Sequence, residues 1–66
     1  MIIYVNGAEQ ALTEPMALTA LLGEMGLTGK RVAIEVNREI VPRAQHNVRL
    51  VQEGDRVEIV QAIGGG

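Results

Sequence analysis

The feature that most constrains the fold is one helical stripe in a chain whose other apolar segments resemble β-strands. Leu18, Leu21, Leu22 and Met25 follow the i, i+3, i+4 and i+7 spacing that places large apolar side chains on one face of a helix. Gly26 comes next, where a left-handed residue is favoured just after a helix ends. Because one helix can cover only one face of one sheet, the sequence indicates an α+β fold.

The remaining apolar segments predict four to five strands. Asn6-Gly7 is the strongest hairpin signal, since both central residues of a type I′ turn need positive φ. Pro42 lacks an N–H and should end a short edge strand. The expected strands cover residues 1–5, 8–12, 31–36, 40–41 and 57–63.

The last of these strands should lie in the centre of the sheet. Val57, Ile59 and Ile63 face one way and Val60 and Ala62 face the other, so both faces are apolar. The resulting order of strand, strand, helix and three strands is the ubiquitin-like β-grasp arrangement. It has a mixed sheet with one main helix on one face, and it requires the first and last strands to pair in parallel.

Composition excludes several classes of function. The 66 residues include no cysteine, which rules out a disulfide framework and a cysteine nucleophile. Six dispersed cationic residues with a net charge of −2, and Tyr4 as the sole aromatic residue, argue against a nucleic-acid partner. The acidic residues lack the spacing of a metal-binding loop, and His46 is expected to be a solvated loop side chain. Without a membrane span or a leader, we expect a cytoplasmic protein.

Three glycines, Gly64-Gly65-Gly66, close the sequence and have no packing value. We therefore expect a β-grasp domain over residues 1–63 and a flexible tail over residues 64–66. Three extended residues span about 10 Å, enough to carry a terminal carboxylate into another protein's active site. There it could attack the α-phosphate of ATP to give an acyl-adenylate, because the α-carboxyl group is ionised at neutral pH. A plain flexible linker has the same composition.

Three segments carry a resemblance to a known family. They are VAIEVNREIVPR (residues 32–43), EGDRVEIV (residues 53–60) and the ending AIGGG (residues 62–66). The chain resembles the ThiS family of thiamin-biosynthesis sulfur carriers, within the ubiquitin-like ThiS/MoaD group. The similarity extends over essentially the whole chain. One departure is Ala17, where the family usually has a Thr or Ser helix cap.

The resemblance implies a carrier that is a protein co-substrate and not an enzyme. An adenylyltransferase of the ubiquitin-activating type (ThiF-like) would activate the Gly66 carboxylate with its own ATP, so the carrier holds no cofactor. A sulfur donor such as a cysteine desulfurase relay would convert Gly66 to a thiocarboxylate, and a thiazole synthase (ThiG-like) would receive the sulfur. The expected partner-binding residues are Val60, Ala62, Ile63, Gly64 and Gly65.

Two alternatives remain open from the sequence. One is the small subunit of molybdopterin synthase, which has the same fold and tail. The other is a β-grasp interaction module that is never activated. Leu12, Met16, Val60 and Ala62 could form an exposed docking patch beside the tail, or they could belong to the core.

Overall fold

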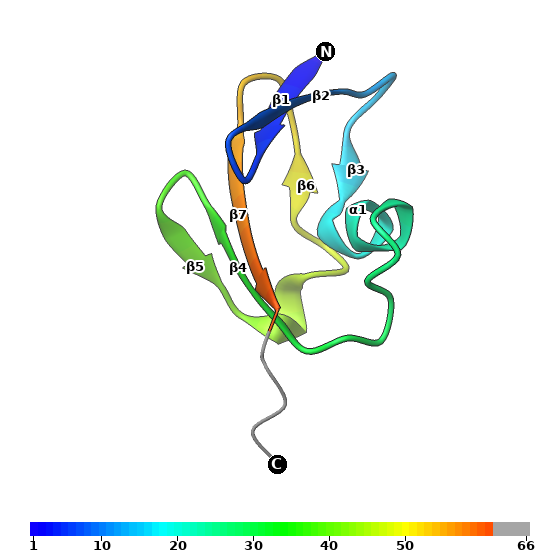
Figure 1. The fold of residues 1–66 in the computed structure, drawn as a ribbon, viewed down its shortest axis with the longest axis vertical. Helices are drawn as coiled ribbons and strands as arrows, with labels where there is room; N and C mark the ends of the chain where they lie inside the picture. The colour runs from blue at the N-terminus through cyan, green and yellow to red at the C-terminus, as the bar shows by residue number, and fades with distance from the viewer. Residues whose placement is uncertain (62–66) are drawn as a thin grey trace.

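The structure is a computed structural model that describes residues 1–61. Figure 1 shows a twisted sheet with a short helix on one side. The elements in chain order are β1 (Ile2–Val5), β2 (Ala8–Ala11), β3 (Met16–Ala17), α1 (Leu18–Glu24), β4 (Val32–Val36), β5 (Glu39–Val41), the 3-10 helix η1 (Arg43–Gln45), β6 (Leu50–Val51) and β7 (Arg56–Gln61).

The main sheet has five strands in the order β2-β1-β7-β4-β5. β7 is central, and β1 pairs with it in parallel, with Tyr4 opposite Arg56 and Val5 opposite Val57. All other pairs in this sheet are antiparallel. The predictions of a β-grasp fold and a central last strand are therefore confirmed, and the strands predicted at 8–12 and 40–41 correspond to the edge strands β2 and β5.

The hairpin between β1 and β2 also strengthens the parallel pair. Asn6 and Gly7 have φ of 51° and 84°, the positive values that a type I′ turn requires. The Asn6 side chain donates from Nδ2 to the Ile59 carbonyl (3.2 Å) and accepts from the Ile59 N–H through Oδ1 (2.8 Å). The amide thus continues the β1–β7 ladder beyond the end of β1, where the backbone has already turned away.

The core lies between α1 and the sheet. Leu18, Leu21 and Leu22 on the helix are buried against alternate residues of the strands, as the helical spacing predicts. Ala17 precedes the helix without a side-chain cap bond, and Gly26 follows it with φ of +73°. The buried side chains are Ile3, Val5, Leu12, Leu18, Leu21, Leu22, Ile34, Val36, Val41, Val51, Val57 and Ile59.

A second, two-stranded sheet was not predicted. β3 pairs with β6 in antiparallel fashion, with Met16 opposite Val51 and Ala17 opposite Leu50. This pairing ties the start of α1 to the segment that precedes β7. Leu12 is buried and Met16 is half-buried against the core, so both belong to the core and not to an exposed patch.

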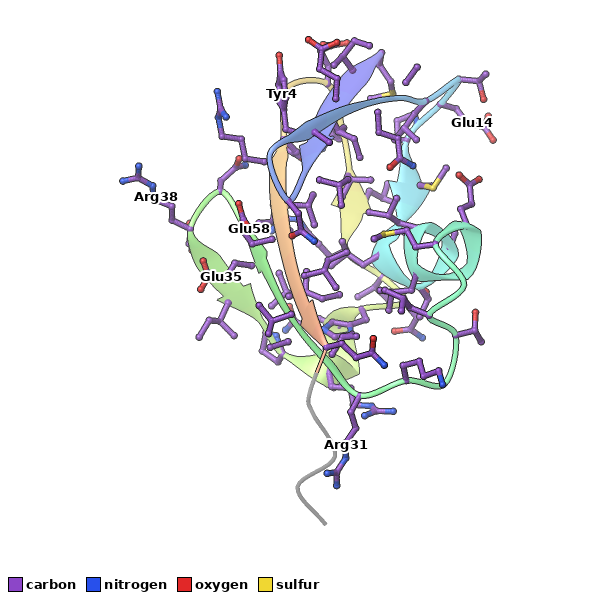
Figure 2. The ribbon with its side chains drawn as sticks, in the orientation of Figure 1. Tyr4, Glu14, Arg31, Glu35, Arg38 and Glu58 are labelled. Atoms are coloured by element: carbon purple, nitrogen blue, oxygen red, sulfur yellow. The ribbon has the colours of Figure 1, made fainter. Side chains whose placement is uncertain are left out.

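We expect Arg38→Gly to stabilise the fold. Asn37 and Arg38 both have positive φ (53° and 71°) in the turn between β4 and β5, and Arg38 extends into solvent there (Figure 2). The left-handed conformation costs a residue with a Cβ roughly 1–2 kcal/mol, and the flexibility of glycine in the unfolded chain offsets about half of that. Urea denaturation should show a gain of about 0.5–1 kcal/mol. Arg38→Ala, which keeps the Cβ, should show none, and an equal gain in both variants would contradict this explanation.

Candidate functional site

The predicted site residues divide into those the structure describes and those it does not. Ala62, Ile63, Gly64, Gly65 and Gly66 lie outside the described residues, so their assignments stay predictions, as does the boundary between domain and tail. Val60 is described. Its side chain is 65% exposed on the face of β7 that points away from the core, as a docking residue must be.

The central strand β7 determines where residues 62–66 begin. β7 pairs with β1 on one side and with β4 on the other, and the β4 pairing continues to Gln61, opposite Val32. The β1 pairing covers Arg56 and Val57, so the last residues of β7 are held in register by β4. Five extended residues after Gln61 could reach at most about 17 Å from this anchored point.

An apolar patch borders this end of β7 on the outer face of the sheet. We define the apolar patch as Ala33, Ile40 and Val60. Ala33 is the direct partner of Val60, and Ile40 is 76% exposed on the adjoining strand β5. Each side chain comes from an exposed position in its strand, while the neighbouring residues Ile34, Val41 and Ile59 are buried in the core. The register therefore assembles the apolar patch from three strands.

Two carboxylates adjoin the apolar patch. Glu35 and Glu58 are direct partners across β4 and β7, and Ile40 lies opposite Glu35 on β5. Figure 2 shows both glutamates on the side of the sheet away from α1. Like charges placed directly opposite each other on a sheet are unfavourable by about 0.2–1 kcal/mol. Arg38 and Arg56 border the same hollow as the two glutamates, so cations of this chain already lie near the pair.

His46 is not the solvated side chain that the sequence predicted. It is 5% exposed, and its Nε2 lies 2.9 Å from the Val41 carbonyl. Because a carbonyl oxygen can only accept, Nε2 carries the proton in this contact. The His46 carbonyl accepts bonds from the Thr19 N–H (3.0 Å) and hydroxyl (3.3 Å). His46 therefore joins the loop after β5 to the start of α1.

A metal site and a membrane span each have structural requirements that the described residues can be compared with. Over residues 1–61, no group of three or more His, Asp or Glu side chains is placed to hold a metal ion. Within the same range, no helix has the length and apolar character needed to cross a membrane.

Comparison with known proteins identifies the family. The sequence profile of the ThiS family matches residues 3–66, nearly the entire chain. The chain belongs to the ThiS family. The sulfur carrier protein ThiS of Escherichia coli (strain K12) is 37% identical over 66 residues, covering 100% of both chains. A crystal structure of the thiamine biosynthesis protein ThiS from Geobacter metallireducens has a TM-score of 0.84 at 30% identity, again covering 100% of both chains.

Part of a longer protein also resembles this ThiS-family chain. A thiazole synthase from Paramagnetospirillum magneticum is 44% identical over 66 residues. The match covers 100% of this chain and 20% of that protein. The chain thus spans about a fifth of the length of this relative.

Sequence reasoning missed most of the apolar patch and the glutamate pair. Val60 was predicted as a partner-binding residue, but Ala33, Ile40, Glu35 and Glu58 were not grouped with it. Their exposed positions follow from strand alternation, whereas their adjacency depends on the register of β5, β4 and β7. The outward alternation of Ala33 and Glu35 with buried Ile34 was the available signal.

Proposed function

We propose that this chain is a sulfur carrier for thiamin biosynthesis, with the Gly66 carboxylate as the group that is activated. The observation that carries the proposal is the full-length match to the sulfur carrier protein ThiS of E. coli. The fold supports it, because β7 is the central strand of the sheet and is paired with β4 as far as Gln61, five residues before Gly66. The proposal assigns no catalytic side chain to the carrier itself.

The activation would take place in a partner of the ubiquitin-activating type. A Gly66 carboxylate oxygen attacks the α-phosphorus of ATP, the bond to pyrophosphate breaks, and an acyl-adenylate forms. Hydrosulfide, or a sulfur relay that delivers its equivalent, then attacks the carbonyl carbon. AMP leaves with the oxygen that attacked phosphorus, and a thiocarboxylate remains. The adenylate is needed because a carboxylate alone is a poor electrophile.

The partner that accepts the sulfur is proposed to be a thiazole synthase. The support is that a region of a P. magneticum thiazole synthase is 44% identical to this chain. A carrier-like region within a protein of that name suggests that carrier and synthase work together. The small subunit of molybdopterin synthase and a non-activated interaction module have no comparable observation in their favour.

The apolar patch is the surface that we propose for partner docking. Ala33, Ile40 and Val60 are exposed and close to the end of β7, so a protein bound there could receive the segment after Gln61. Glu35 and Glu58, with Arg38 and Arg56 nearby, provide charged groups of both signs beside the apolar patch. A recognised interface typically combines such an apolar centre with a polar rim.

The test is the intact mass of the protein. The chain is incubated with ATP, an adenylyltransferase of the ubiquitin-activating type from the same organism, and sulfide. We expect a mass increase equal to the difference between one sulfur and one oxygen atom, dependent on ATP and on the enzyme. Fragmentation should place the increase on Gly66. No mass change with an enzyme shown to be active would overturn the carrier proposal and favour the interaction module.

A further inference from the structure

The charges of this chain are separated along the sequence and in space. Residues 25–34 and 40–52 contain four of the six cationic residues and none of the eight acidic ones. The four are Lys30, Arg31, Arg43 and Arg49. Figure 1 shows that the loop before β4 and the segment around η1 meet at the end of the molecule where β7 ends. One end of a chain with net charge −2 is therefore positive.

A hollow lies between these two segments. It has a volume of about 390 Å³ and is bounded by the loop after α1 and by η1 with the residues after it. Lys30 and Arg43 supply positive charge, and Thr28 and Asn47 supply side-chain donors. None of its lining residues is acidic. The hollow thus combines two cations and two neutral side-chain donors with apolar neighbours and no acidic lining residue.

The walls of the hollow are held by contacts within the fold. His46 and Thr19 both line the hollow. The His46 side chain is buried and bonded to the Val41 carbonyl, and the His46 carbonyl accepts a hydrogen bond from the Thr19 hydroxyl. On the other wall, the Lys30 N–H donates to the Leu27 carbonyl at 3.0 Å. Donors on preorganised backbone lose less entropy when they bind a ligand than donors on a free loop.

We propose that this hollow binds a phosphate group. A phosphate monoester carries close to two negative charges at neutral pH and offers three acceptor oxygens, which suits two cations with neutral donors between them. Arginine can contact two of the oxygens at once, while lysine acts as a compact charge. The hollow contains no aromatic side chain to stack on a base. Recognition therefore rests on the phosphate group, whether it comes from inorganic phosphate or a nucleoside monophosphate.

The experiment is an NMR titration of the isotope-labelled full chain with sodium phosphate, AMP, adenosine and sodium chloride at constant ionic strength. Phosphate and AMP should cause saturable amide shifts that are largest at residues 28–30 and 43–47. Adenosine and chloride should not. Similar affinities for AMP and phosphate identify the phosphate as the recognised group. Shifts that appear equally with chloride, or that do not saturate, overturn the proposal.

Three charge-removing variants distinguish a specific phosphate site from non-specific electrostatic attraction. Lys30→Gln and Arg43→Gln alter exposed side chains, so both should fold, and each should raise the Kd for phosphate by about tenfold or more. Arg38→Gln removes the same charge at the β4–β5 turn, far from the hollow (Figure 2), and should leave the Kd within about twofold. An equal weakening in all three would show that net charge alone attracts the anion.

Discussion

Replacing Ile34 with alanine is expected to lower the free energy of unfolding by about 3 kcal/mol. Ile34 is 1% exposed and lies on β4 between Val41 of β5 and Ile59 of β7. Truncating a buried isoleucine typically costs 2–5 kcal/mol, because transfer energy is lost and a cavity is left. A 66-residue domain has roughly 3–10 kcal/mol of stability in total, so this single change removes a large part of it.

Ile40→Ala is the matched control for this prediction. It makes the same chemical change on the adjoining strand, but the Ile40 side chain is 76% exposed. Only strand propensity should be lost, which is worth less than about 1 kcal/mol. Urea unfolding followed by circular dichroism measures both variants on the same scale. If Ile34→Ala cost no more than Ile40→Ala, the register that buries one residue and exposes the other would be wrong.

The sequence predicted those parts of the fold that depend on local pattern. The apolar residues of the last strand predicted its central position in the sheet. The apolar stripe from Leu18 to Met25 predicted a helix that covers one face of that sheet. The Asn6-Gly7 turn followed from the φ values that only a few residues accept. In each case a short segment contains enough information to specify its own structure.

Features that arise from tertiary contacts were not predicted. β3 and β6 have two residues each, too few to show alternation, and they exist because Met16 meets Val51 across the fold. His46 is buried with its Nε2 bonded to the Val41 carbonyl and its own carbonyl bonded to Thr19, and neither partner can be recognised from a single histidine in a loop. The apolar patch has the same origin, since Ala33 and Val60 meet only when β4 and β7 pair.

Removing Gly66 is expected to lower the rate of thiocarboxylate formation by about 100-fold or more without changing stability. Deleting one residue moves the terminal carboxylate back toward the domain by about 3.3–3.6 Å. A misplacement of only about 1 Å between reacting groups can cost on the order of 100-fold in rate. Because β7 is paired with β4 through Gln61, the strand cannot shift along the sheet to restore the lost length. Intact mass measured over time with the activating enzyme, ATP and sulfide gives the rate.

Adding one glycine after Gly66 provides the opposing control. A glycine chain that is too long can bend to bring its end back, whereas one that is too short cannot stretch beyond its full extension. The longer variant should therefore lose less activity than the shortened one, although both move the carboxylate by one residue. Equal thermal unfolding midpoints would show that neither change affects the domain. If both variants reacted as fast as the original chain, the position of the Gly66 carboxylate would not matter, and activation at a fixed distance from β7 would be excluded.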